Sequence, residues 1–287
     1  MKGKGIEEII RKRYSCRSYK DISLSEKDRN DIKEFISQEF TGPFGSSSRF
    51  TIFASEPADS TALKGLGTYG FIKNPAAFIA GIVKESTMNM EDFGYSLERI
   101  ILHSSEMGLG SCWLGGSFKR SSFADKAKIA EDEIIPAVAA IGYPADKKTI
   151  TDRIIRASAG SAKRKDAEEL FFSSGKKKLN INYKEGYGRV LEMVRLAPSA
   201  SNKQPWRVVK EDGKNIFHFY IERTASYARQ IKLVGGADLQ RVDMGIAMCH
   251  FECTAIEMGL KGIWKNESIS GAAIPAGWEY SITWDGE

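Results

Sequence analysis

The sequence predicts an α+β fold made of two tandem repeats that pack against each other within one chain. The main observation is internal: Asp92–Trp113 reads DFGYSLERIILHSSEMGLGSCW, and Asp243–Trp264 reads DMGIAMCHFECTAIEMGLKGIW. Superposed without a gap, the two segments share an aspartate, a glycine, the run Glu-Met-Gly-Leu and a tryptophan. Each segment reads as a long buried helix that ends at Gly-Leu and turns into a strand. Two further observations support the repeat: other elements also occur in pairs, and the polar motifs are divided between the copies.

The other elements can be followed in chain order. The first repeat is expected to begin with a helix, a basic turn and a second helix, and Ser25 with Asp28 resembles a capping box at the start of that second helix. The apolar runs Ala76–Lys84 and Asn215–Arg223 predict a matching pair of core strands. The runs IIPAVAAIGYP and WEYSITW predict another pair.

The boundary between the repeats is expected at the Gly-, Lys- and Asn-rich stretch SSGKKKLNINYKEG. It divides the chain into a first repeat at 1–172 and a shorter second repeat at 173–287, packed together as one unit. This arrangement is an intrachain pseudo-dimer. Duplication for stability alone is the alternative, because a repeat does not by itself imply a shared site.

Composition narrows the function classes. The 287 residues are 42% hydrophobic, which supports a real core and excludes a disordered chain. The net charge of +5 is mild. It favours an ordinary soluble protein with one anionic ligand over a protein that binds nucleic acid. The four cysteines lack CxxC spacing and there are three histidines, so neither a disulfide framework nor a His-rich metal site is expected. Without a long apolar stretch near the N-terminus, we expect no signal peptide and no membrane span, and a cytoplasmic enzyme or binding protein.

A polar loop follows a helix-like run in the second copy. Gly188–Ala197 carries apolar residues at helical spacing, Pro198 stops it, and the stretch PSASNKQPW follows before a short strand. Asn202 and Gln204 offer donors and acceptors together, which suits a polar ring edge. An ordinary helix stop and turn is the alternative.

The polar motifs of the two copies are complementary. The first copy has RYSCR (Arg13–Arg17) near its start and AKRK (162–165) at its end, and the second copy has no matching basic turn. Conversely, the loop of the first copy that corresponds to PSASNKQPW is TGPFGSSSR, without Asn, Gln or Trp. Two cationic clusters and a serine suit a phosphate, although a lone RxSxR is also typical of a solvated helix end. If the copies pack face to face, one complete site forms across their interface, and its symmetry mate is lost.

A glycine-rich element completes the set. In GLGSCWLGGSF, Gly115 and Gly116 allow backbone N–H groups to approach a flat ligand, although a tight turn would also use them. The spacing does not fit the dinucleotide fingerprint G-x-G-x-x-G, so no Rossmann site is expected.

Together these residues resemble the nitroreductase family of FMN-dependent oxidoreductases. The resemblance is carried by RYSCRSY, PSASNKQPW, the paired D-x-G…GLG segments, WLGGSF and KRKDAEEL, and covers nearly the whole chain. The tandem order is most similar to the branch called putative TM nitroreductases. The resemblance implies a nitroreductase-like α-β-α sandwich. Ordinary members are homodimers with two interface sites, so it also implies one FMN per chain here.

The resemblance also implies which residues bind FMN. The phosphate and ribityl chain are assigned to Arg13, Ser15 and Arg17, with Tyr14 in the same turn. Arg164 and its helper Lys163 are assigned to the phosphate. The loop of the other repeat supplies contacts to the ribityl chain or the flavin ring from Pro198, Ser199, Asn202 and Gln204. Leu114, Gly115 and Gly116 lie near flavin N5. The sequence departs from the family at Ala200, where many members have serine, and at Ala162, where they have a basic residue.

The activity implied is that of an NAD(P)H oxidoreductase. In a two-stage cycle, NADH or NADPH reduces the flavin and a nitroaromatic, quinone or similar small acceptor reoxidises it. No catalytic side chain or metal is required, and Cys249, His250 and Cys253 are expected to pack within a core helix. The alternative is a non-catalytic flavin-binding protein, a store or sensor. We expect a monomer with an internal pseudo-dimer, a small-molecule acceptor, and neither nucleic-acid nor membrane partners.

Overall fold

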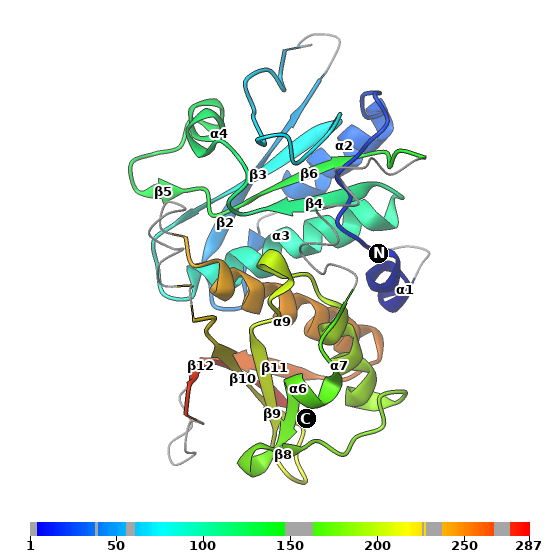
Figure 1. The fold of residues 1–287 in the computed structure, drawn as a ribbon, viewed down its shortest axis with the longest axis vertical. Coiled ribbons are helices and arrows are strands. Elements are labelled where there is room, and N and C mark those ends of the chain that lie inside the picture. Colours follow the sequence, from blue (N-terminus) through cyan, green and yellow to red (C-terminus); the bar gives the residue numbers. More distant parts are fainter. Residues whose placement is uncertain are drawn as a thin grey trace.

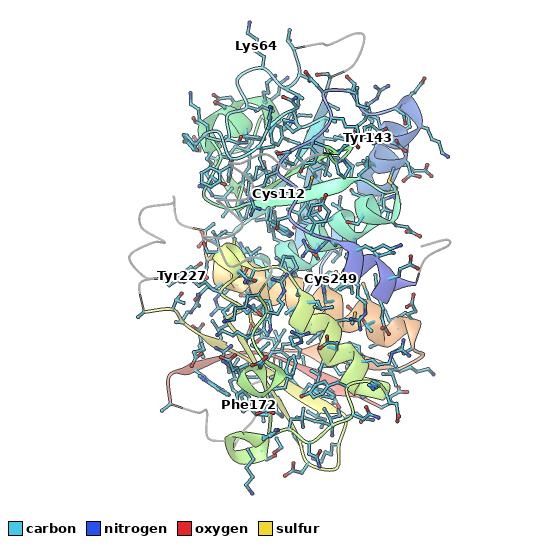
Figure 2. All side chains as sticks on the ribbon, turned by 45° about the vertical axis from the view of Figure 1, so that its right-hand side comes forward. Lys64, Cys112, Tyr143, Phe172, Tyr227 and Cys249 are labelled. Atoms are coloured by element: carbon cyan, nitrogen blue, oxygen red, sulfur yellow. The ribbon has the colours of Figure 1, made fainter. Side chains whose placement is uncertain are left out.

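The computed structural model describes residues 5–37, 40–55, 61–146, 163–225, 227, 237–266 and 276–287. Two units, each a sheet with helices, are stacked along the long axis of the molecule (Figure 1). Helices α3 and α9 lie between the two sheets, and their packing against each other joins the units. In Figure 2, the labelled Cys112 lies in the first unit, whereas Cys249 lies on α9 of the second.

The first unit is built around a mostly antiparallel sheet with strand order β1-β2-β3-β6-β4, with β5 paired to β3. Its elements are α1 (Ile6–Lys12), α2 (Glu26–Ser37), β1 (Phe40–Thr41), β2 (Ser47–Ala54), β3 (Ala77–Lys84), α3 (Asn89–Glu106), β4 (Gly110–Leu114), α4 (Arg120–Ala127), β5 (Glu133–Ile134) and β6 (Val138–Gly142). Side chains of β3 alternate between two apolar clusters. Ala77 and Ile79 join the cluster that contains α3, and Phe78 packs with Phe123 of α4 on the other face.

The second unit repeats this strand order. Its elements, with the segment that leads into it, are α6 (Ala167–Leu170), β7 (Phe171–Ser173), a 3₁₀ turn (Ser174–Lys176), β8 (Lys177–Lys178), α7 (Gly186–Leu196), a 3₁₀ turn (Ala200–Asn202), β9 (Trp206–Lys210), β10 (Ile216–Glu222), α9 (Leu239–Glu257), β11 (Gly262–Lys265) and β12 (Trp278–Gly286). The sheet runs β11-β12-β10-β9-β7-β8. The order β9-β10-β12-β11 therefore matches β2-β3-β6-β4 of the first unit. The two tandem repeats predicted from the sequence are confirmed in this fold.

The two repeats meet where α3 crosses α9. A Cβ atom added to Gly94 would lie 2.1 Å from the carbonyl oxygen of Val242, and one added to Gly245 would lie 1.9 Å from that of Glu91. Gly94 and Gly245 are the shared glycines of the sequence repeat, and Glu91 and Val242 also correspond. The crossing thus has an internal twofold symmetry. Glycine is required at both positions because no side chain fits between the helix backbones.

The first repeat ends by joining the second sheet. Strand β7 pairs in parallel with β9, through Phe171 to Val208 and Ser173 to Lys210. A parallel pair needs a crossover rather than a hairpin, and here the crossover is formed by α7 and the polar loop after it. The boundary expected between residues 172 and 173 falls inside β7. The segment that begins at Lys163 therefore runs from the first repeat along the interface into the second sheet.

The elements agree with the sequence expectations in type and place. The run expected as a helix at Gly188–Ala197 is α7, which ends at Leu196, before Pro198. At the start of α2, the side chain of Ser25 accepts a hydrogen bond from the backbone N–H of Asp28 at 3.0 Å. Among the described helices, none combines the length and the apolar character that a membrane span requires.

Candidate functional site

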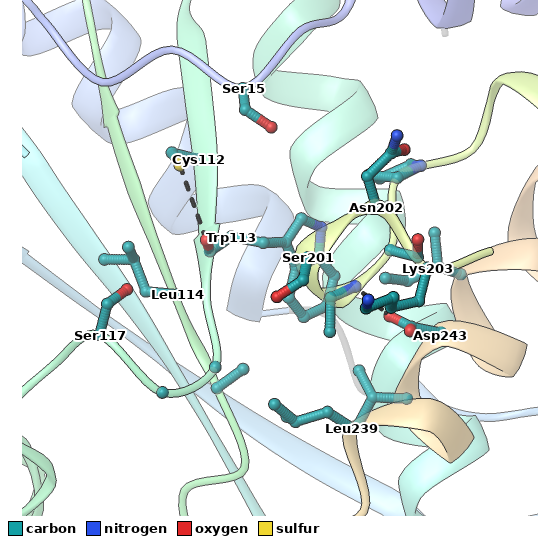
Figure 3. Close-up of a pocket in the computed structure, with 18 of the residues that line it drawn as sticks. Ser15, Cys112, Trp113, Leu114, Ser117, Ser201, Asn202, Lys203, Leu239 and Asp243 are labelled. Atoms are coloured by element: carbon teal, nitrogen blue, oxygen red, sulfur yellow. Dashed lines mark hydrogen bonds between the residues drawn. The ribbon is translucent and has the colours of Figure 1, made fainter. Parts of the chain in front are cut away.

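A cavity of about 670 Å³ lies between the two repeats (Figure 3). The first repeat lines it with the basic turn, the loop around Tyr69, the end of β4, Ala137 and Arg164. The second lines it with the polar loop after α7 and with the first turns of α9. Each repeat therefore supplies one part of a single composite site.

The basic turn is held against β4 by its backbone. Helix α1 ends at Lys12 and the chain becomes extended at Arg13, so that Ser15 forms a parallel bridge with Ser111. The N–H of Cys16 donates to the carbonyl oxygen of Ser111 at 2.8 Å. This pairing holds the turn beside β4, where Arg13, Tyr14, Ser15 and Arg17 line the cavity.

The guanidinium of Arg13 is buried and lies 3.8 Å from the carboxylate of Glu98, measured from Nε to Oε1. Glu98 also accepts a hydrogen bond from the indole of Trp113 at 2.7 Å and contacts Nε2 of His250 at 2.9 Å. Nδ1 of His250 faces the carbonyl oxygen of Met193 at 3.0 Å; since that oxygen can only accept, Nδ1 carries a proton. Burial lowers the pKa of Arg13, and the nearby Glu98 opposes this shift. The network fixes two cavity-lining residues, Arg13 and Trp113, from behind.

Arg164 brings a second cation to the same cavity. Its Nη1 donates to Oδ1 of Asn202 at 2.5 Å, and its Nη2 donates to the carbonyl oxygen of Leu196 at 3.1 Å. Burial, followed by the positive charges of Arg13 and Arg195, lowers the pKa of Arg164 to about 10. Two guanidinium groups from distant segments therefore repel each other at this end of the cavity. A bound anion would relieve that repulsion.

The polar loop after α7 has an unusual backbone. Ser201, Asn202 and Gln204 have φ angles of 49°, 55° and 48°, in the left-handed region that non-glycine residues rarely occupy. The side chain of Ser199 accepts a hydrogen bond from the N–H of Gln204 at 2.8 Å and helps to close the loop. Such strain is typical of segments that bind ligands.

The two carboxamides of this loop attach it to the first repeat. The side chain of Asn202 donates to the carbonyl oxygen of Lys163 at 2.7 Å. Oε1 of Gln204 accepts from the N–H of Lys165 at 2.9 Å, and Nε2 donates to the carbonyl oxygen of Asn202 at 3.1 Å. The two side-chain amides thus hold the segment that begins at Lys163 against the loop. This attachment positions Arg164 at the cavity.

At the end of β4, Gly115 lies against the start of α9. A Cβ atom added there would be 2.6 Å from Cδ1 of Leu239. The carbonyl oxygen of Gly115 is 3.4 Å from Nη2 of Arg120, a side chain that also binds the carbonyl oxygen of Ile135 at 2.9 Å. Glycine here leaves room for Leu239 at the start of α9 to pack against the end of β4. The sequence did not indicate this role.

The predicted site residues come together with two exceptions. Those that line the cavity are Arg13, Tyr14, Ser15, Arg17, Leu114, Gly115, Gly116, Arg164, Pro198, Ser199 and Asn202. Lys163 and Gln204 do not line it: Lys163 offers its carbonyl oxygen to Asn202, and Gln204 is buried behind the loop. Ala200 lines the cavity, whereas Ala162 lies outside the described residues.

Several lining residues were missed by sequence reasoning. They are Tyr69, Phe71, Cys112, Trp113, Ser117, Ala137, Ser201, Lys203, Thr224, Tyr227, Leu239, Gln240, Val242, Asp243 and Ile246. Asp243 could have been found, because it is one of the residues shared by the repeated segments. Tyr69 and Phe71 are 68% and 41% exposed and lie in a loop without a repeat partner, so no pattern identified them.

The internal twofold symmetry relates the cavity to a second position between the repeats, and the residues there are different. Glu91 corresponds to the cavity-lining Val242, and its carboxylate accepts a hydrogen bond from Nη1 of Arg241 at 2.8 Å. Arg241 also pairs with Glu279 of β12, and Oγ of Ser281 lies 3.5 Å from Glu91. A partly exposed ion cluster around the buried Glu91 therefore stands where the cavity has the apolar Val242. Among the described residues, no group of three His, Cys, Asp or Glu side chains could hold a metal.

Comparisons with known proteins agree with this architecture. The family model described as "Putative TM nitroreductase" matches residues 5–255. A solved structure from Thermotoga maritima, described as a putative nitroreductase, is 20% identical and has a TM-score of 0.59; the match covers 98% of this chain and 93% of that one. An FMN-dependent nitroreductase from Clostridium difficile is 21% identical, with a TM-score of 0.38, over 49% of this chain and 88% of that one. No curated protein matches the sequence.

Proposed function

Because the chain belongs to the family described as "Putative TM nitroreductase", we propose that it is an FMN-dependent NAD(P)H oxidoreductase with one FMN site between its repeats. The observation that carries the proposal is the convergence of Arg13, Arg17 and Arg164 on one cavity that both repeats line. The finer assignments also rest on the names of similar proteins, one of which is called an FMN-dependent nitroreductase.

The residues present fit FMN. The cavity volume of about 670 Å³ lies within the range of about 300–1,000 Å³ that is usual for small-molecule sites. Burial, and after it the positive charge of Arg13, lowers the pKa of Arg164, and two such cations at one end of the cavity support an anionic group there. Guanidinium groups suit a phosphate because their N–H groups match its oxygens in pairs. The end of β4 lines the cavity with the apolar Leu114 and two glycines, Gly115 and Gly116, which suits a flat ring.

Each part of the chain has a distinct task in this proposal. Arg13, Arg17 and Arg164, with Ser15, bind the phosphate. The loop from Pro198 to Asn202 borders the ribityl chain, and Leu114, Gly115 and Gly116 border the ring. When bound, FMN supplies hydride transfer from NADH or NADPH to a nitroaromatic, quinone or similar small acceptor in a two-stage cycle.

The walls of the cavity also set what can approach the ring. Tyr14, Tyr69 and Phe71 are partly exposed aromatic residues that line the cavity, so they can stack on a planar substrate. Gln204 and Lys163, although they do not line the cavity, hold the phosphate-binding segment in place. We propose a monomeric chain in the cytoplasm that acts on small molecules.

Absorption spectroscopy tests the proposal. The purified chain is mixed with excess FMN, freed of unbound flavin, and then treated with NADH or NADPH under exclusion of oxygen. We expect retained flavin bands that bleach and recover when a quinone is added. Absence of retained flavin would contradict the proposal. Retained flavin that neither donor bleaches would instead support the alternative, a flavin-binding store or sensor.

A further inference from the structure

Asp92 and Asp243 are equivalent residues with different hydrogen bonds. Both lie in the first turns of the central helices and both are buried. The oxygens of Asp92 accept from the backbone N–H groups of Phe44 at 3.0 Å and Ser46 at 2.8 Å. In the second repeat, Oδ1 of Asp243 accepts from the N–H of Ala200 at 2.8 Å. Its Oδ2 is buried and has no hydrogen-bond partner among the described residues.

The difference follows from the two loops. In the first repeat, the loop around Phe44 folds over Asp92, and a Cβ atom at Gly42 would lie 2.2 Å from that side chain. In the second repeat, the loop carries the left-handed residues Ser201 and Asn202 and borders the cavity instead. Asp243 lines that cavity (Figure 3). The second loop thus leaves one oxygen of the carboxyl group without a partner, on a residue that lines the cavity.

Gln240 shows the same feature one helical turn earlier. It is 1% exposed and lines the cavity, and its Nε2 donates to Oγ1 of Thr224 at 2.7 Å. Its Oε1 has no hydrogen-bond partner among the described residues. Residues three apart lie on one face of a helix. One face of α9 thus holds two buried, unpartnered polar atoms on residues that line the cavity, and a buried polar group without a partner is costly.

The surroundings of Asp243 favour the neutral carboxyl group. Burial raises its pKa well above the usual 3.8; the N–H of Ala200 opposes the shift, and the like charge of Asp238 adds to it. Tyr227 lies beside Asp238 and lines the same cavity. Lys203 on the loop also lines the cavity, and its side chain is exposed to solvent. On α3, Glu91 is paired with Arg241. None of the ion pairs among the described residues includes Asp243.

We propose that Asp243 is a neutral carboxylic acid that donates a hydrogen bond from Oδ2 to an acceptor atom of the bound ligand. The proposal rests on the proposed function, because it takes the ligand to be the flavin or its electron acceptor. The flavin and a quinone offer carbonyl oxygens, a nitroaromatic offers nitro oxygens, and the flavin ring also offers nitrogen acceptors. Gln240 provides the complementary acceptor on the same face of α9.

Two substitutions distinguish a neutral donor from an anion. In Asp243→Asn, Oδ1 still accepts from Ala200 and the amide group donates to the ligand in place of the acid. In Asp243→Leu, which has a similar size, the donor is lost. We expect Asp243→Asn to bind as wild type does and Asp243→Leu to bind about three- to tenfold more weakly, which is the usual effect of one hydrogen bond. The thermal midpoint of each variant verifies that it folds.

The two ligand sources are separated by two measurements. The dissociation constant for FMN, from fluorescence quenching, changes in Asp243→Leu if the acceptor atom belongs to the flavin. The KM for 1,4-benzoquinone, measured with saturating FMN, changes instead if the atom belongs to the electron acceptor. Equal loss in Asp243→Asn and Asp243→Leu would contradict a neutral donor, and no loss of either quantity in Asp243→Leu would contradict the hydrogen bond.

A spectroscopic readout does not depend on the leucine variant. In infrared difference spectra of wild type with and without FMN or benzoquinone, we expect the C=O band of a protonated carboxyl group to shift on binding. The band is expected to be absent from Asp243→Asn. Wild type that binds FMN but shows no such band contradicts the inference alone, whereas wild type that binds no FMN contradicts the proposed function as well.

Discussion

Gly94 and Gly245 face each other's helices at the crossing of α3 and α9, each against the carbonyl oxygen of a residue three positions before the other. This contact sets how closely the two repeats approach, and so the width of the cavity between them. An added methyl group at either position would come within 2.1 Å of a backbone oxygen, which cannot move aside without shifting a helix.

Substitution of either glycine should therefore separate the repeats. We expect Gly94→Ala and Gly245→Ala each to lower the free energy of unfolding by about 3 kcal/mol, because the core is overpacked. Urea denaturation measures this. The control is Ser105→Ala on the same helix α3. It removes only a hydroxyl that donates a hydrogen bond to the carbonyl oxygen of Ile101, and it should change the free energy of unfolding little. A glycine variant as stable as Ser105→Ala would contradict the close crossing.

The two equivalent aspartates should respond differently to the same substitution. Asp92→Asn places an N–H₂ group opposite a backbone N–H, so we expect a loss of about 1–3 kcal/mol in the free energy of unfolding. Asp243→Asn keeps the oxygen that Ala200 binds and should cost much less. Thermal denaturation of both variants compares them. Equal losses would mean that both oxygens of Asp243 also need donors.

The pH dependence of stability should reflect the neutral state of Asp243. Since its pKa is raised in the folded chain, the folded state retains a proton that the unfolded state loses above about pH 4. The contribution of this residue to stability therefore falls as pH rises from there. The difference in unfolding free energy between wild type and Asp243→Asn, followed from pH 4 to 8, measures it; we expect the variant to gain relative to wild type. A difference that is independent of pH would show an unshifted carboxyl group.

Arg164 should recognise the phosphate rather than the flavin ring. We expect Arg164→Ala to weaken FMN binding by about tenfold or more, the usual effect of losing a hydrogen bond to a charged group, and to leave riboflavin binding nearly unchanged. Arg189→Ala, which removes the same charge from the exposed side of α7, is the control. If riboflavin and FMN lose affinity equally, Arg164 acts on the loop through Asn202 instead.

Glu98 should affect both the stability of the fold and the binding of FMN. Glu98→Gln leaves the buried Arg13 and His250 without a carboxylate, and we expect a loss of about 3 kcal/mol in unfolding free energy together with weaker FMN binding. Denaturation and FMN titration measure the two effects. Asp132→Asn, which breaks an exposed pair with Lys84, is expected to cost less than about 1 kcal/mol and to leave FMN binding unchanged. Unchanged binding in Glu98→Gln would show that Arg13 is held without it.

Much of the fold was readable from the sequence because it is repeated. The shared residues of Asp92–Trp113 and Asp243–Trp264 have physical causes in the structure: the aspartates bind loop amides, the glycines allow the helices to cross, and the Gly-Leu pair ends each helix before its strand. A pattern of this kind can be recognised because the same packing problem is solved twice.

The site was only partly readable. The basic turn and the polar loop were found because their residue types suit a phosphate and a polar ligand. The role of Gln204 could not be predicted from its residue type. The left-handed backbone around it decides whether its amide faces the cavity or binds the neighbouring segment. Other residues reach the cavity only through tertiary packing, among them Tyr69, Phe71 and those of α9. No motif or repeat in the sequence marks these residues as part of a site.

The central claim is that the two repeats build a single composite FMN site, and calorimetric titration of the purified chain with FMN tests it most directly. We predict one FMN bound per chain, and strong loss of that binding in Arg164→Ala. Two FMN per chain would mean that the position occupied by Glu91, Arg241 and Glu279 is also a site, and no binding would contradict the composite site altogether.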